Sequence, residues 1–148
     1  MSELRSIRSI DRALRSRKSS VRWSAAHAAT DYVHADPDAL WNLIVKHGSS
    51  HVRDTRTAVA VCMLETLLEL RFRAYFPRLE RAIGAGNLLL GDTLSLCWRQ
   101  GQARRPANAR RWKSLIHEWE RMGGSMVLAA RPTRRVTVKR IIARRHSR

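Results

Sequence analysis

The stretch VRDTRTAVAVCMLETLLELRF (residues 52–72) contains the longest helical pattern in the sequence and decides the fold class. Apolar residues recur in it at intervals of three and four, which is the period of an α-helix with one buried face. Either Ser49 or Ser50 can cap its first turn, because a serine hydroxyl accepts hydrogen bonds from unpaired backbone N–H groups. The stretch therefore predicts a long helix with a broad buried face made of Val59, Cys62, Met63, Thr66, Leu67 and Leu70.

The sequence on either side predicts further helices joined by short turns. Asp36 suits an N-cap and Pro37 the first helical position, and Gly48 is expected to end that helix in the left-handed conformation. Pro77 is expected to break the long helix because it lacks a backbone N–H. No stretch before residue 125 has the alternation of a strand, so the sequence predicts an all-α protein. The predicted helices cover about residues 4–14, 19–33, 37–47, 52–76, 77–83, 87–99 and 107–122.

Positive charge is concentrated at the two ends of the chain. The 148 residues include 29 Lys and Arg against 12 Asp and Glu, a net charge of +17. Residues 1–22 carry +5, residues 23–102 are neutral, and residues 103–148 carry +12. Basic ends commonly contact polyanions, because Lys and Arg neutralise phosphates and release counterions. The alternative is that the charge only maintains solubility or reflects an arginine-rich proteome.

Composition and charge together suggest three regions. We expect a basic amphipathic N-terminal helix at 1–18, a helical domain at 19–124, and a basic tail at 125–148 that is largely disordered when free. The stripe formed by Leu4, Ile7, Ile10 and Leu14 predicts that the first helix docks on the core. Membrane-surface binding by this helix is less favoured, because its apolar stripe is narrow and lacks Trp or Phe.

One internal echo resembles a known repeat family. The segment SSVRWSAAHAA (19–29) is echoed by SSHVRDTRTAVA (49–60), which places Val21-Arg22 and Val52-Arg53 31 residues apart. A Val-Arg pair at a helix start followed by an Ala-rich face resembles HEAT-like or armadillo-like repeats over about residues 19–83. The resemblance implies a short α-solenoid of stacked antiparallel helices that offers a surface to a partner. Such families are mostly scaffolds. Some bacterial members are DNA glycosylases, but these are considerably longer, and their catalytic aspartate has no assigned counterpart here.

The polar residues form no recognisable catalytic or metal-binding pattern. His47 and His51 have the spacing of a helical metal pair, but Gly48 places a helix boundary between them. Cys62 and Cys97 lie on apolar faces, where buried structural thiols are usual, and two cysteines are too few for a disulfide-dense secreted scaffold. No Walker A or dinucleotide-binding glycine pattern occurs. We therefore expect a protein that is not an enzyme and uses no cofactor.

The sequence also gives expectations about membranes and location. No apolar run approaches the roughly 20 residues needed to span a bilayer. The N-terminus lacks the apolar stretch and the cleavage site of a secretory signal. We expect a cytoplasmic protein without integral membrane association.

The predicted interface lies in the basic C-terminal third. Trp112 is flanked by Arg and Lys, and such interleaving is typical of surfaces that stack on bases and follow phosphates. Alternatively, Trp112 and Trp119 pack the last helix onto the rest of the protein. The predicted phosphate-contacting residues are Arg104, Arg105, Arg110, Arg111, Lys113, Arg131, Arg134, Arg135, Lys139, Arg140, Arg144, Arg145 and Arg148.

Two functions remain open at this point. The first is a non-enzymatic helical-repeat module that binds DNA or RNA through its basic ends, with weak sequence selectivity because the contacts are to the backbone. The second is a protein-interaction adaptor, such as a small bacterial immunity, defence or regulatory accessory protein, whose neutral region 19–102 binds a partner while the basic ends meet an acidic surface. The charge distribution slightly favours nucleic acid.

Overall fold

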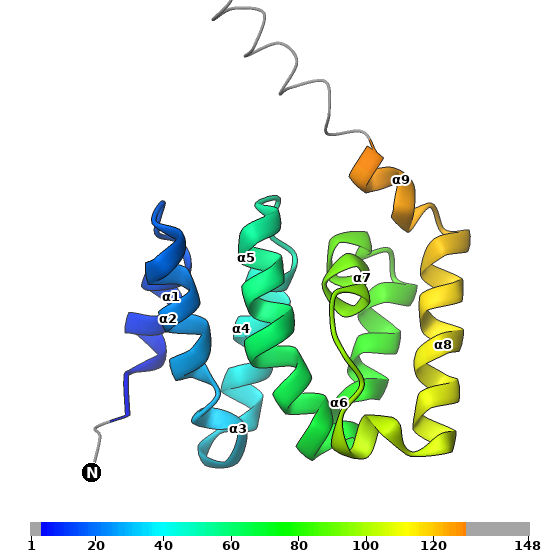
Figure 1. The fold of residues 1–148 in the computed structure, drawn as a ribbon, viewed down its shortest axis with the longest axis horizontal. Coiled ribbons are helices and arrows are strands. Elements are labelled where there is room, and N and C mark those ends of the chain that lie inside the picture. The colour runs from blue at the N-terminus through cyan, green and yellow to red at the C-terminus, as the bar shows by residue number, and fades with distance from the viewer. Residues whose placement is uncertain (1–3, 130–148) are drawn as a thin grey trace, which may run out of the picture.

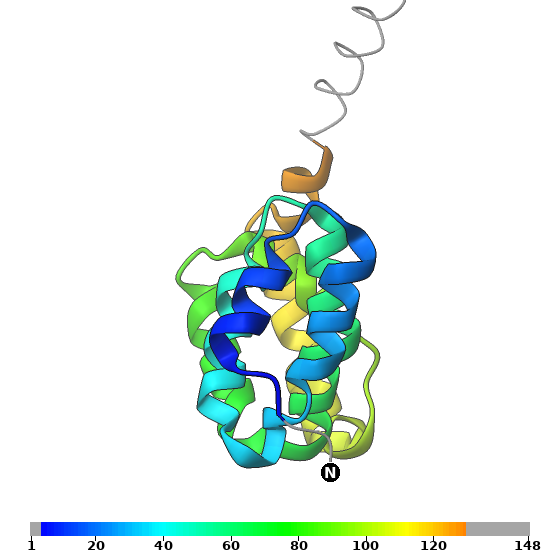
Figure 2. The same ribbon diagram turned by 90° about the vertical axis from the view of Figure 1, so that its left-hand side faces the viewer.

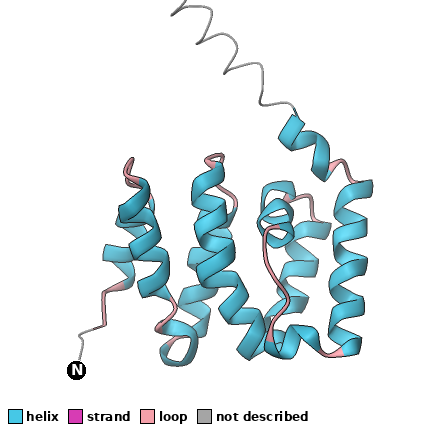
Figure 3. Ribbon diagram, viewed as in Figure 1, coloured by secondary structure: helices cyan, strands magenta, loops and turns pink. Residues whose placement is uncertain are grey.

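All the regular structure of residues 4–129, the part of the chain that the computed structural model describes, is helical (Figure 3). The all-α prediction is confirmed. None of the helices in this part of the chain has the length and apolar character needed to cross a membrane. The α-helices are α1 (Ile7–Leu14), α2 (Ser19–Ala29), α3 (Tyr32–Ala35), α4 (Pro37–Gly48), α5 (Arg53–Ala58), α6 (Glu65–Gly84), α7 (Leu88–Ser95), α8 (Pro106–Arg121) and α9 (Gly124–Ala129), and they are accompanied by the π-helix η1 (Val59–Leu64) and the 3-10 helix η2 (Gly101–Arg104).

Successive helices pair as antiparallel hairpins that lie side by side in a row (Figure 1). Helix α1 packs on α2, α4 packs on α5 and η1, and α6 packs on α7 and α8. Figure 2 looks along the row, with the α1–α2 hairpin in front of the later ones. One continuous apolar core runs through the row, from Ile10 and Leu14 in α1 to Trp112 and Trp119 in α8. The predicted docking of the N-terminal helix on the core is confirmed for Ile7, Ile10 and Leu14, whereas Leu4 precedes α1 and is 43% exposed, so its predicted place in the stripe is wrong.

The first hairpin is joined to the second by Arg22, the fourth residue of α2. Its Nη1 donates to the Ser16 carbonyl at 2.8 Å, and its Nη2 donates to Asp54 Oδ2 at 2.5 Å. Trp23 Nε1 donates to the other oxygen of the same carboxylate at 3.2 Å. Hydrogen bonding from Arg22 lowers the pKa of Asp54, so this carboxylate stays ionised.

The same contact recurs in the next hairpin around Arg56, the fourth residue of α5. Its Nη1 donates to the Ser50 carbonyl at 2.8 Å, and its Nε donates to Asp92 Oδ2 in α7 at 2.9 Å. Arg22 and Arg56 are 34 residues apart and each reaches the carbonyl six residues before it. These similar contacts pair Arg22 with Arg56, whereas the sequence echo pairs it with Arg53.

Helices α5, η1 and α6 follow one another without a loop, and the π-helix between them changes which residues are buried. A π turn is wider than an α turn, so it rotates the helix face that follows it. Leu68 and Phe72 are consequently buried, while Leu70 is 39% exposed. The prediction that Leu70 belongs to the buried face is wrong, because it assumes that the α-helical period continues unbroken through η1.

The break in this long helix lies at Arg71 (φ −136°, ψ 32°), and Pro77 stands inside α6, so the predicted break at Pro77 is wrong. The side chain of Gln102 in η2 satisfies the backbone groups at the break. It donates to the Leu70 carbonyl at 2.9 Å and accepts from the Phe72 N–H at 3.0 Å. A side chain that enters the helical ladder is a common cause of a kink. Gln102 of η2 therefore fixes the position of the bend.

Hydroxyl side chains mark two helix ends that come earlier than predicted. Thr30 donates to the His27 carbonyl at 2.7 Å, and α2 ends at Ala29 with α3 following as a separate turn. Ser95 donates to the Asp92 carbonyl at 2.6 Å, and α7 ends there instead of at residue 99. Such local bonds compete with the helical ladder. Residues 96–100 therefore form a loop.

The start of α4 agrees with the prediction, but the conformation of the glycine at its end does not. Asp36 caps the helix by accepting from the Ala39 N–H at 3.1 Å, and Pro37 is its first residue, as predicted. Gly48, expected in the left-handed conformation, is the last helical residue and has no positive φ. A Cβ there would lie 3.0 Å from Leu90 Cδ1, so a small residue lets α7 approach α4 closely.

Asp11 ties α1 to α4 through two basic neighbours. Its carboxylate accepts from Lys46 Nζ at 3.0 Å and lies 2.7 Å from His47 Nε2. The hydrogen bond from Lys46, helped by that from His47, lowers the pKa of Asp11. Burial lowers the pKa of His47 and outweighs the opposing effect of Asp11. Both groups therefore take up a proton more readily in the unfolded chain than in the folded protein.

We expect the free energy of unfolding to decrease as the pH falls from about 7.5 to about 5.5, because the unfolded state binds more protons when the folded pKa is depressed. His47→Gln should flatten this dependence, and urea unfolding followed by circular dichroism at the two pH values measures it. His51→Gln is the matched control, because His51 is exposed. A His47→Gln variant whose stability depends on pH as the wild type's does would contradict the expectation.

Candidate functional site

The predicted phosphate-binding residues on the described chain lie in and around α8. Arg104 belongs to η2, Arg105 directly precedes α8, and Arg110 and Lys113 lie on its exposed side. All four are exposed, and none forms an ion pair with another residue of the described part. The other predicted basic residues, in the tail, lie outside the described residues: Arg131, Arg134, Arg135, Lys139, Arg140, Arg144, Arg145 and Arg148.

Arg111 differs from these four residues because the fold already uses its charge. Its guanidinium pairs with Glu80 in α6 and lies over the ring of Phe76, 5.5 Å from the centroid. Its charge is therefore partly neutralised, and we exclude Arg111 from the phosphate-contacting set.

Trp112, which the sequence predicts as a base-stacking residue, is a core side chain. Only 5% of the residue is exposed, and its ring stacks on Phe76 with a centroid distance of 6.1 Å and an interplanar angle of 22°. Phe76 stacks in turn on Phe72 at 4.4 Å. So little of the ring is exposed that a base cannot stack on it, and the stacking role is corrected to the alternative, in which Trp112 and Trp119 hold α8 on the core.

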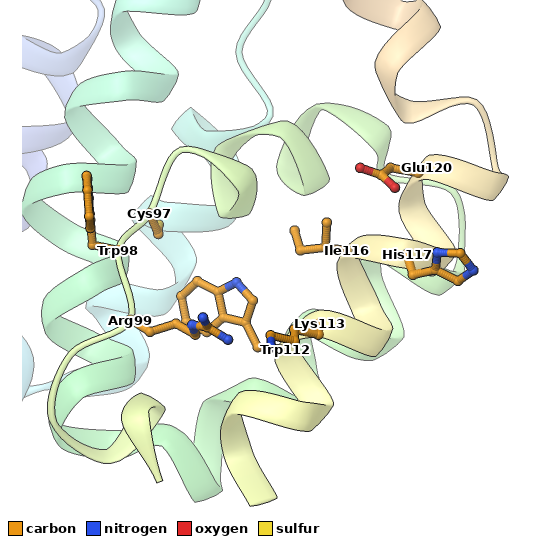
Figure 4. Close-up of a pocket in the computed structure, with 8 residues that line it drawn as sticks. All are labelled: Cys97, Trp98, Arg99, Trp112, Lys113, Ile116, His117 and Glu120. Atoms are coloured by element: carbon orange, nitrogen blue, oxygen red, sulfur yellow. The ribbon is translucent and has the colours of Figure 1, made fainter. Parts of the chain in front are cut away.

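A groove of about 460 Å³ lies between α8 and the loop that follows α7 (Figure 4). Trp98 stands at one rim and Lys113 and His117 at the other, with the side chains of Arg99, Trp112 and Ile116 between them. The lining is mixed: Trp98, Trp112 and Ile116 contribute apolar surface, and Arg99 and Lys113 contribute positive charge. The lining residues are Cys97, Trp98, Arg99, Trp112, Lys113, Ile116, His117 and Glu120.

Trp98 is the aromatic side chain that this surface presents to solvent. The residue is 76% exposed, the largest value among the exposed large apolar residues of the described chain. Its backbone N–H donates to the Glu65 carboxylate, and Gln100 Nε2 donates to Glu65 Oε1 at 3.1 Å. Just before it, Cys97 Sγ donates to the Ala60 carbonyl at 3.4 Å. The loop is therefore anchored on both sides of Trp98, which holds the ring outward.

The residue that anchors this loop is Glu65, a buried acidic side chain. Glu65 is 8% exposed, and its Oε2 is buried without a hydrogen-bond partner in the described part of the chain. Burial raises the pKa of this carboxyl, against the hydrogen bond from the Trp98 backbone. Burial also raises the pKa of Cys97 well above its usual range, and the thiol at the groove stays protonated. Cys97 is accordingly a packing side chain and not an activated nucleophile.

Further exposed basic side chains lie beyond the groove, on η2 and the first half of α8. Arg110 lies one helical turn before Lys113 on α8, so both point to the same side. We call Arg99, Arg104, Arg105, Arg110 and Lys113 the basic edge. Glu120 is the one acidic residue among the side chains that line the groove. In the described residues no group of His, Cys, Asp and Glu side chains is suited to hold a metal ion.

Comparison of the chain with protein-family models, with curated proteins and with solved structures returned no match. The candidate site is therefore argued from its own geometry. Sequence reasoning missed Trp98 because the residue was placed inside a helix over 87–99. The adjacent Arg99 and the glycine at 101 were the signal that could have placed it in a loop beside a cation.

Proposed function

We propose that the protein is a non-enzymatic helical-repeat module that binds nucleic acid through its basic edge. The observation that carries the proposal is a group of exposed cations, none of which is paired with an acidic residue in the described part of the chain, together with an exposed tryptophan on an anchored loop. The HEAT-like solenoid character is part of the same proposal. It is supported by the row of hairpins and by the repeated contacts of Arg22 and Arg56. We place this activity in the cytoplasm.

The geometry favours contacts to the phosphate backbone. Cations that follow one another along η2 and the first half of α8 suit a chain of phosphates, since each Lys or Arg neutralises one charge and releases a counterion. Contacts of this kind position a nucleic acid without reading its sequence. The arginines of the tail, which lie outside the described residues, would add to the same electrostatic attraction. The proposed binding is therefore salt-dependent and weakly sequence-selective.

A variant that neutralises four of the five residues of the basic edge tests the proposal. The variant replaces Arg104, Arg105, Arg110 and Lys113 with Gln. We expect at least a tenfold loss of affinity for a labelled oligonucleotide, and a plot of log affinity against log salt that is shallower by about 3, since each phosphate contact contributes roughly 0.7–0.9 to the slope. Fluorescence anisotropy of the full chain at several salt concentrations measures both quantities.

The matched control removes the same charge elsewhere. It replaces four exposed arginines that form no ion pair in the described part of the chain: Arg8, Arg12, Arg53 and Arg73. We expect this control to lose less than about threefold in affinity, because it changes only the long-range field. Equal losses in both variants would show that net charge alone attracts the ligand. Intact binding in both would leave an acidic protein partner as the better explanation of the basic edge.

A further inference from the structure

We infer that the groove beside Trp98 takes unpaired bases, so that the nucleic acid which binds there is single-stranded. The inference rests on the proposed function and names the class of ligand for the same surface. It is carried by three observations: the exposure of the Trp98 ring, the concave shape of the surface next to it, and the arrangement of charge around the groove.

The ring of Trp98 is open to a planar ligand. Of the five tryptophans, Trp41, Trp112 and Trp119 are at most 8% exposed, and Trp23 is partly buried and bonded to Asp54, whereas Trp98 is 76% exposed. An exposed tryptophan on an anchored loop loses little freedom when a base stacks on it. Every base has a π face, so stacking of this kind is tolerant of sequence.

The shape of the surface selects against a duplex. The floor of the groove, formed by Trp112 and Ile116, lies between the rims that carry Trp98 and Lys113 (Figure 4). A duplex keeps its bases stacked inside and is read by protein elements that protrude into its grooves. A concave surface cannot reach those bases. An unpaired base can turn toward the protein, and a volume of about 460 Å³ is within the size range of pockets that hold small planar ligands.

The charges indicate how a strand would lie. Arg99, Lys113 and His117 line the groove, and Arg110 continues the cationic surface one turn further along α8. Phosphates on either side of a stacked base would meet these side chains. Glu120, at the other end of the groove, disfavours a phosphate there and can accept a hydrogen bond from a base amino group. The strand is therefore expected to follow the Arg99–Lys113–Arg110 side.

The experiment compares three probes of equal length on the full chain: a single-stranded oligothymidine of about 12 nucleotides, a duplex, and an abasic oligomer with the same phosphates. We expect the wild type to bind the single strand at least tenfold tighter than the abasic oligomer and tighter than the duplex. Trp98→Ala should remove most of that difference, and Trp98→Phe should keep most of it. Val52→Ala, at an exposed apolar residue in another hairpin, is the control.

The outcomes separate the inference from the proposed function. If the probes bind with salt dependence but Trp98→Ala binds oligothymidine as tightly as the wild type, the groove does not stack bases. Equal affinity for the abasic oligomer, or a preference for the duplex, would overturn the inference in the same way, and backbone binding by the basic edge would stand. If the wild type binds none of the three probes at low salt, the proposed function fails and the inference fails with it.

Discussion

Gly91→Ala is expected to lower the free energy of unfolding by at least about 3 kcal/mol, at the upper end of what overpacking costs in a closed core. A Cβ at Gly91 in α7 would overlap the indole ring of Trp119. A Cβ at Gly124 in α9 would overlap the same ring. Trp119 is thus held in a slot between two backbones, and its Nε1–H donates to the Leu88 carbonyl at 2.8 Å. The ring cannot move aside without losing this bond.

Urea unfolding followed by far-ultraviolet circular dichroism measures this effect, and the chain offers a matched control. Gly84, near the end of α6, has no atom within 4 Å of an added Cβ. Gly84→Ala should therefore be neutral or should stabilise the protein by about 0.5–1 kcal/mol, the usual advantage of alanine in a helix. If Gly91→Ala is as stable as Gly84→Ala, the slot around Trp119 does not exist as described.

Arg56→Met is expected to destabilise the protein by about 3–5 kcal/mol, the usual cost of removing one partner from a buried ion pair. The Arg56 side chain is 0% exposed and that of Asp92 is 3% exposed. The substitution would leave the Asp92 carboxylate buried without its cation and the Ser50 carbonyl without its donor. The contact also joins the second hairpin to the third, so its loss should loosen the row between α5 and α7.

Arg22→Met is the natural comparison, because Arg22 has the same place in the preceding hairpin. Its partner Asp54 is 41% exposed, so water can solvate the carboxylate once the cation is gone. A cost of only about 1–2 kcal/mol is therefore expected, as for a pair that stays partly solvated. The double variant Arg56→Met with Asp92→Asn should recover part of the loss, because no buried charge remains. A cost for Arg56→Met no greater than that for Arg22→Met would contradict the account.

Local patterns in the sequence predict much of this fold. The period of apolar residues predicts the helices, and Asp36 and Pro37 predict the start of α4. Helix α8 ends at Arg121, one residue before the predicted end at 122, and Gly123 follows with a positive φ. These features depend on residues a few positions apart. The π-helix before Glu65 has no local signal of this kind. The bend at Arg71 could not be predicted in this way either, because it depends on Gln102, which lies 30 residues after its bonding partner Phe72.

In the candidate site, too, the features that depend on nearby residues were predicted and those that depend on distant contacts were not. The predicted cations around α8 are exposed as their charge pattern suggested, and Arg111 differs from the others only because it is paired with Glu80 in α6. The sequence predicts base stacking at Trp112, whereas the exposed tryptophan is Trp98. Both residues have a basic neighbour in the sequence. Trp112 is buried because α8 packs on Phe76, and Trp98 is exposed because α7 ends three residues before it. Neither fact is visible from neighbouring residues alone.

The account of the basic edge is best tested by the affinity of the full chain for single-stranded oligothymidine, measured by anisotropy between about 50 and 200 mM salt. Neutralisation of several phosphates predicts that the affinity falls by at least about tenfold over this range, with log affinity linear in log salt. Tight binding that hardly changes with salt, or no binding at the lowest salt concentration, would contradict it.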